Sequence, residues 1–220
     1  MYDRDYLMRL ISQTTTMLGR LMGLKEQKKQ EEAMTLIDEF LSRELRLRSR
    51  LALGLSDEDL LQMLSVGGVP NYESVAILAV FLKEEGDLLS GTGQTGDAVP
   101  RYEKALRLML RVLEEHGPVQ GLGLEERVGQ LLGRLAPYEK AAATKRAVWR
   151  WHESQGRYAE AENLLYELYE DEGATPEEGR SFYERLAKLS DEELEKGDLP
   201  RSELLEGRRQ WDALAGETAS

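Results

Sequence analysis

The sequence predicts an all-α protein built from antiparallel helix pairs. Apolar residues recur at three- and four-residue spacing along most of the 220-residue chain, which is the periodicity of one helix face. Leu, Glu, Ala and Arg are abundant and runs of β-branched residues are few, so the composition favours helices over strands. Three segments have the pattern of a helix N-terminus, in which a hydroxyl residue is followed three positions later by a carboxylate. These segments are Ser56–Asp59, Thr175–Glu178 and Ser190–Glu193.

The first predicted helix begins at Asp3 and ends near Gly23. It bears a wide apolar stripe at alternating four- and three-residue spacing, a pattern that suits helix pairing. The stripe consists of Leu7, Ile11, Thr14, Leu18 and Leu21, widened by Leu10, Met17 and Leu24. We expect the stripe to pack on the next helix of the same chain. The alternative is a homodimer paired through this helix. The interface residues would then be Leu7, Ile11, Leu18 and Leu21.

Three further helices are predicted before residue 90. One extends from about residue 28 to 48, and a short one begins at Ser56 and ends near Gly67. The third begins after Pro70 and contains the apolar run Val75–Leu82. A membrane-spanning helix needs about 20 apolar residues, so we interpret this eight-residue run as a buried helix.

The Gly-rich segment 90–96, SGTGQTG, is predicted to be the most flexible loop. Asp97 is expected to cap the helix that follows it. A further helix over residues 124–135 contains Gly129 and Gly133, four residues apart on one face. Each glycine costs about 1 kcal/mol relative to alanine in a helix. We therefore expect close contact with another helix at these two positions.

Residues 149–169 predict a helix, a tight turn and a second helix that packs back on the first. Gly156 can adopt the left-handed backbone conformation that ends a helix. Ala161 is small, so a neighbouring helix can approach closely there. This hairpin resembles a tetratricopeptide repeat, a helix-turn-helix unit of about 34 residues. The residues that match the second helix of that family are Gly156, Tyr158, Ala161 and Leu165.

The resemblance implies a right-handed superhelical stack of helix pairs that binds a protein or peptide partner. In that family the first helix of each pair lines the concave side. Counted from Gly156, this side would display Arg146, Arg150 and Glu153 as ligand-binding residues. Two arginines could hold a carboxylate through paired hydrogen bonds. The alternative is that they pair with acidic residues of the chain itself.

The opening segment, MYDRDYLMRLI, resembles the start of an uncharacterised bacterial family that contains a domain of unknown function. That resemblance implies a shared fold and assigns no activity.

The chain is acidic, with a net charge of −12. Residues 1–55 have ten Lys and Arg against eight Asp and Glu, so the acidic excess lies in the remainder. An acidic body repels nucleic acid and anionic membranes. The one basic run, Arg43 to Arg50, is expected to be a solvated face, with contact to RNA or phosphate as the alternative. The absence of cysteine and of a signal-peptide layout favours the cytoplasm.

No catalytic or metal constellation is recognised, and no cofactor is expected. Gly91–Gly96 matches the G-x-G-x-x-G pattern, but no predicted strand precedes it, as a dinucleotide site requires. His152 and Glu153 begin a zinc motif, but Gly156 stands where its second histidine must be. The adjacent carboxylates Glu84 and Glu85 should splay apart on a helix, on a solvated face.

The predicted function is a non-enzymatic protein-interaction scaffold. A homo-oligomer paired through the first helix is the alternative, and an enzyme on an unfamiliar helical scaffold is a third hypothesis. We expect one domain over residues 1–215, with a weak division at the 90–96 loop, and a disordered tail over residues 216–220.

Overall fold

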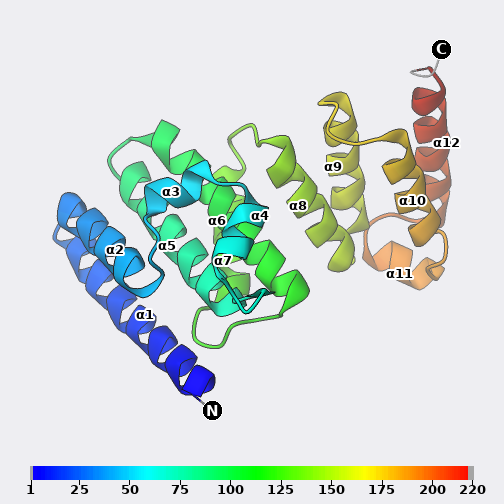
Figure 1. Cartoon of the computed structure of the whole chain (residues 1–220). Helices are drawn as coiled ribbons and strands as arrows, with labels where there is room; N and C mark the ends of the chain where they lie inside the picture. The colour runs from blue at the N-terminus through cyan, green and yellow to red at the C-terminus, as the bar shows by residue number, and fades with distance from the viewer. Residues whose placement is uncertain (1, 218–220) are drawn as a thin grey trace. The chain divides into compact units, whose positions relative to one another are not determined.

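A computed structural model describes residues 2–217 of the chain (Figure 1). Within these residues the chain forms twelve α-helices and one short β-hairpin. The prediction of a helical protein with antiparallel helix pairs is confirmed. The β-hairpin was not predicted. The chain divides into two compact units, residues 1–140 and 141–220. The 90–96 loop lies inside the first unit, and the single domain over residues 1–215 stays a prediction.

The first unit contains seven helices and the hairpin. Its elements are α1 (Tyr2–Glu26), α2 (Gln30–Glu44), α3 (Ser49–Gly54), α4 (Asp57–Met63), β1 (Ser65–Val66), β2 (Val69–Pro70), α5 (Tyr72–Ser90), α6 (Thr95–Glu115) and α7 (Leu124–Leu135). The two strands pair antiparallel, with Val66 opposite Val69. Gly67 and Gly68 connect them with φ angles of 60° and 83°, values that favour glycine.

Helix α5 is the centre of the first unit and contacts α1, α2, α4, α6 and α7. Every residue from Ser74 to Gly86 is buried, which confirms the predicted buried run Val75–Leu82. The run Val75–Leu82 is apolar on every side of the helix, so neighbouring helices can cover it on all sides. Asn71 caps the helix, because its side chain accepts a hydrogen bond from the Ser74 N–H at 2.9 Å.

Helices α5 and α6 form a tightly packed hairpin. A Cβ added to Gly86 would lie 2.5 Å from the Tyr102 ring, so glycine is required for this approach. Helix α6 begins at Thr95 with Gln94 at its N-cap, so Asp97 lies in the first turn and is not the predicted cap.

The second unit contains five helices. They are α8 (Ala142–Ser154), α9 (Tyr158–Glu170), α10 (Pro176–Leu186), α11 (Asp191–Lys196) and α12 (Arg201–Glu217). The predicted α8–α9 hairpin is confirmed: Gly156 has a φ of 69°, and Ala161 is fully buried. The carbonyl of Gly197 accepts hydrogen bonds from the N–H groups of Tyr158 and Ala159, both at 3.1 Å. The turn between α11 and α12 therefore braces the start of α9.

Two of the three predicted capping signatures form complete capping boxes. Thr175 and Ser190 each accept a hydrogen bond from a backbone N–H three residues later, and the carboxylates of Glu178 and Glu193 bond back. Ser56 also caps its helix, α4, by accepting from the Asp59 N–H at 3.0 Å. Local sequence therefore sets all three helix starts.

Two further predictions differ from the structure. A Cβ built on Gly129 or Gly133 of α7 would meet no atom within 4 Å, so no helix packs closely there. Helix α12 includes Gly216 and Glu217, the first residues of the predicted disordered tail. The remainder of that tail, residues 218–220, lies outside the described residues.

Candidate functional site

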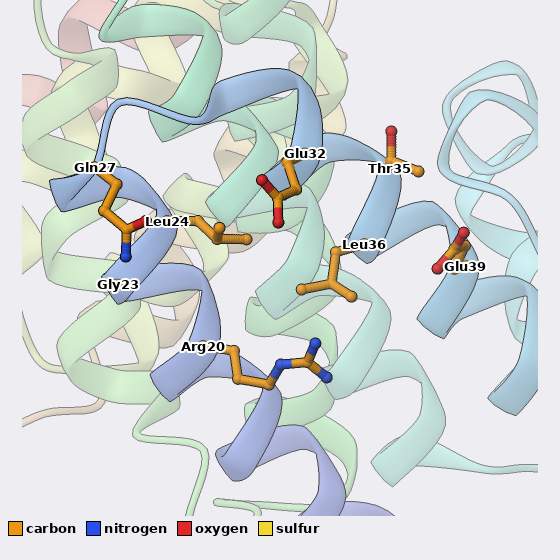
Figure 2. Close-up of a pocket in the computed structure, with 8 residues that line it drawn as sticks. All are labelled: Arg20, Gly23, Leu24, Gln27, Glu32, Thr35, Leu36 and Glu39. Atoms are coloured by element: carbon orange, nitrogen blue, oxygen red, sulfur yellow. The ribbon is translucent and has the colours of Figure 1, made fainter.

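A groove lies between α1 and α2 in the first unit. Two pockets of about 530 and 230 Å³ form it, and Arg20 lines both. The larger pocket is lined by Arg20, Gly23, Leu24, Gln27, Glu32, Thr35, Leu36 and Glu39 (Figure 2). The smaller pocket is lined by Ser12, Gln13, Thr16, Met17, Arg20, Phe40 and Arg43. We call the two pockets together the α1–α2 groove.

The floor of the α1–α2 groove is apolar. Met17 and Phe40 are 4% exposed, and Leu24 and Leu36 are half-buried. Figure 2 shows Leu24 and Leu36 pointing toward one another from the two helices. The groove stays open because Gly23 has no side chain, and a Cβ built there would meet nothing within 4 Å. The sequence thus leaves an uncovered apolar strip between two paired helices.

The charges along the groove are separated. Glu32 and Glu39 of α2 lie in the larger pocket, Arg43 lies in the smaller one, and Arg20 lies between them. Glu32 is 3.3 Å from Lys29, and Arg43 is 2.6 Å from Glu44, so both pair with a neighbour in sequence. Among the described residues, neither Arg20 nor Glu39 has an ion-pair partner. Both are free to contact a bound molecule.

Two of the predicted ligand-binding residues are bonded to α10 in the second unit. Arg146 donates hydrogen bonds to the carboxylate of Glu178, at 3.3 Å for the Nη2–Oε2 pair, and to the carbonyl of Gly173. Glu153 accepts two hydrogen bonds from Arg185, at 2.6 and 2.8 Å. Arg146 therefore pairs with an acidic residue of the chain itself, as the alternative expects, and Glu153 is occupied by a basic one.

These two bridges flank an aromatic contact between the same helices. The rings of Trp149 and Phe182 lie between them, with centroids 6.2 Å apart. The side chain of the third predicted residue, Arg150, is exposed and forms no hydrogen bond or ion pair with the described residues. The hydrogen bond from Arg146 lowers the pKa of Glu178, and Arg150 contributes to the same shift. The α8 face predicted to bind a ligand is thus covered by α10 at two of its three positions.

The predicted interface residues of α1 mostly contact their own chain. Leu21 is fully buried, and Leu7, Ile11 and Leu18 are half-buried. The most buried line of α1 consists of Leu10, Thr14, Met17 and Leu21. Thr14 is tolerated there because its hydroxyl donates to the Leu10 carbonyl at 2.8 Å. The large apolar residues that α1 exposes most are Met8 and Met22, at 57% and 63%.

A charged segment of α5 is buried, which the sequence did not indicate. Glu84 and Glu85 are 8% and 1% exposed, so the predicted solvated face is wrong. Their predicted divergence is confirmed: Glu84 accepts a hydrogen bond from Arg127 at 2.8 Å, and Glu85 accepts one from Arg101 at 2.9 Å. Burial raises the pKa of Glu85. Burial acts in the same direction on Glu84, but the cations around it lower its pKa overall.

The Gly-rich segment and His152 do not form the nucleotide and metal sites that their sequence motifs could suggest. The Gly91–Gly96 segment follows helix α5 and ends inside helix α6, so it lacks the strand–loop–helix arrangement of a dinucleotide site. His152 is half-buried, and burial lowers its pKa. In the described part of the chain, no three His, Cys, Asp or Glu side chains are grouped so that they could hold a metal ion.

A family profile matches residues 1–216, and its description is a family of unknown function (DUF6483). The chain belongs to this family. The DUF6483 match includes both compact units and confirms the expectation, drawn from the opening segment, of a family of unknown function. No curated protein and no solved structure matches the chain. Among residues 2–217, none of the helices has the length and apolar character needed to cross a membrane.

Proposed function

We propose that this protein is a non-enzymatic scaffold that binds an amphipathic helix of a partner protein in the α1–α2 groove. The observation behind this proposal is an apolar floor between two helices, with acidic side chains in one pocket and a basic side chain at the other end. The groove follows α1 from Ser12 to Gln27, about 22 Å at 1.5 Å per residue. That length matches about four turns of a bound helix.

A helix suits this groove better than an extended peptide. Two paired helices leave a channel into which the side-chain ridge of a third helix can pack. A bound helix presents apolar side chains at three- and four-residue spacing, which would contact Leu24, Leu36 and Met17 along the floor. An edge strand, in contrast, needs unpaired backbone groups, and those of α1 and α2 bond within their own helices.

Charge complementarity defines the partner further. Its basic residues should lie over Glu32 and Glu39, and its acidic residues should lie over Arg20 and Arg43. Arg20 and Glu39 would gain ion pairs on binding, which favours one orientation of the helix and rejects the reverse one.

Site-specific crosslinking tests this proposal. A photoreactive amino acid at Thr35 lies in the groove, and one at Thr15 lies on α1 outside it. The two threonines are matched, because each is exposed and donates its hydroxyl to the carbonyl four residues earlier. We expect the Thr35 probe alone to crosslink in cells to an amphipathic segment with basic residues at one end and acidic residues at the other. A crosslinked segment without this pattern, or equal crosslinking from Thr15, would refute the proposal.

Filling the groove supplies a second measurement. Gly23→Leu places a side chain in the larger pocket, whereas Gly19→Leu places one on α1 outside both pockets. Neither added Cβ would meet an atom within 4 Å, so both variants should fold. We expect Gly23→Leu alone to reduce crosslinking from Thr35 and to weaken binding of the identified segment.

Self-association through α1 is the second candidate function. It is supported by the exposure of Met8 and Met22, which are two heptads apart on one face. Light scattering of the wild type and of Met22→Glu decides it: a dimer that becomes a monomer supports this function. A crosslink from Thr35 to a second copy of the chain would instead make that copy the occupant of the α1–α2 groove.

We propose further that α8 and α9 form a tetratricopeptide-like pair. The left-handed Gly156 and the fully buried Ala161 support this assignment. We also propose a cytoplasmic location, which the absence of cysteine supports. The test of the pair is Ala161→Trp, which should unfold the hairpin.

A further inference from the structure

A second pocket of the first unit, distinct from the α1–α2 groove, has a different chemistry. It has a volume of about 380 Å³ and lies where the α1–α2 turn meets the end of α5. Its polar lining consists of Lys25, Lys28, Gln30, Asp87 and Thr92. We call it the Lys25 pocket.

The floor of the Lys25 pocket belongs to a buried network of charges. Lys83 is 2.8 Å from Asp87, and Arg127 is 2.8 Å from Glu84. Lys25 bonds to Glu84 and lies 4.0 Å from Asp87. Three cations thus face two carboxylates, which leaves one positive charge in surplus. The side chains of Lys83, Glu84 and Asp87 are 7%, 10% and 16% exposed, so water screens this surplus poorly.

Both carboxylates are ionised at neutral pH. Burial alone would raise the pKa of Glu84 and Asp87, but the surrounding cations lower both pKa values below their ordinary range. The second oxygen of Asp87 is also occupied, because the Tyr102 hydroxyl donates to it at 2.9 Å. Asp87 therefore has little remaining capacity to balance a cation or to bind one.

Two further cations lie beside the pocket. Lys28 lines it, is exposed, and has no ion-pair partner among residues 2–217. Arg134, which is 57% exposed, lies 3.7 Å from Asp87. The network's one surplus charge, together with Lys28 and Arg134, gives the pocket three surplus positive charges, on a chain whose net charge is −12. A bound dianion would balance most of this surplus.

We propose that the Lys25 pocket binds a small phosphorylated molecule through its phosphate group, held by Lys25 and Lys28. A phosphate monoester is largely a dianion at pH 7, since its second pKa is about 6. Each lysine ammonium has three N–H donors, so Lys25 can contact a phosphate while bonded to Glu84. The Gln30 side chain donates to the Thr92 hydroxyl at 3.1 Å, which joins two other residues of the lining.

The size of the pocket favours an organic phosphate over inorganic phosphate. A water molecule occupies about 30 Å³ in the liquid, so a pocket of about 380 Å³ has room for more than a phosphate group. Leu88 adds an apolar wall for the organic part. This inference does not depend on the function proposed for the α1–α2 groove.

Phosphorus NMR titration tests the proposal. Glucose 6-phosphate and inorganic phosphate are titrated separately at constant ionic strength, and succinate is added as a competing dicarboxylate. We expect saturable binding of glucose 6-phosphate, weakened about tenfold by Lys28→Gln, because a charge-assisted hydrogen bond is lost. Lys29→Gln is the matched control, since Lys29 is adjacent, carries the same charge and does not line the pocket.

Each other outcome overturns the proposal. Equal weakening by Lys28→Gln and Lys29→Gln would show a diffuse charge effect rather than a site. Binding of inorganic phosphate but not of glucose 6-phosphate would exclude an organic phosphate. Displacement by equimolar succinate would assign the pocket to carboxylates, and no saturable binding would remove it as a site.

Discussion

Trp211 of α12 lies directly over Gly179 of α10, so closely that a Cβ added to Gly179 would fall 1.9 Å from the ring carbon Cε2. The ring also contacts Tyr166 and Tyr169, with centroid distances of 5.4 and 4.9 Å. Its Nε1–H donates to the Pro176 carbonyl at 3.0 Å. One glycine in α10 thus allows the only fully buried tryptophan among the described residues to join α12 to α9 and α10.

The variant Gly179→Ala is expected to lower the free energy of unfolding by about 3 kcal/mol, at the upper end of the usual cost of overpacking. The new methyl group must displace the indole ring, and the ring is held on several sides. The higher helix propensity of alanine returns at most about 1 kcal/mol. Urea unfolding followed by tryptophan fluorescence measures the change. A loss of less than about 1 kcal/mol in the free energy of unfolding would mean that α12 can shift to make room for the methyl group.

The variants Gly129→Ala and Gly133→Ala in α7 should act in the opposite direction. Both glycines are exposed, and an added Cβ would meet nothing within 4 Å. Each substitution should therefore raise the free energy of unfolding by about 1 kcal/mol, the difference in helix propensity. Urea unfolding of the two variants and of the double variant measures this gain. A loss of stability would indicate that another molecule packs on this face of α7.

Local features of the fold could be predicted from the sequence. Ser56, Thr175 and Ser190 begin helices because each needs only a partner three residues away. The left-handed turn at Gly156 and the buried run in α5 are also encoded within a few residues. These features follow from backbone chemistry and hydrophobic periodicity, which a single sequence contains.

Features that depend on distant residues could not be predicted. Glu84 was expected on a solvated face because its own helix gives no sign of Lys25, 59 residues earlier, or of Arg127, 43 residues later. The partners of Arg146 and Glu153 lie on α10, 32 residues away in each case. The α1–α2 groove likewise depends on how two helices pair. Periodicity identifies the buried stripe of a helix but not which neighbour covers its edges.

The two bridges between α8 and α10 should differ in strength. Arg146→Ala is expected to cost about 2 kcal/mol, because it removes charge-assisted bonds to Glu178 and leaves the Gly173 carbonyl without this donor. Arg185→Ala should cost less than about 1 kcal/mol, since the Arg185 side chain is 49% exposed and water screens its pair with Glu153. Denaturant unfolding of both variants makes the comparison, and equal losses would contradict it.

The stability of the second unit should depend on pH through Glu162. Burial and the nearby Glu203 raise its pKa, and the hydrogen bond from Tyr183 at 2.6 Å offsets this only in part. The folded chain therefore keeps the Glu162 proton to a higher pH than the unfolded chain, whose value is about 4.5. The protonated Glu162 carboxyl therefore contributes its full stabilisation below about pH 4.5. This contribution is lost as the pH rises through the raised folded pKa.

The variant Glu162→Gln removes this loss, because its amide oxygen can still accept the Tyr183 hydrogen bond and cannot ionise. Its free energy of unfolding, relative to the wild type, should increase as the pH rises above about 4.5 and should become constant once the pH has passed the raised folded pKa. Glu170→Gln makes the same charge change at an exposed position of α9 and should not reproduce that increase. Urea unfolding at several pH values measures both differences. A difference that falls with rising pH would mean that Tyr183 stabilises the ionised carboxylate more than burial destabilises it.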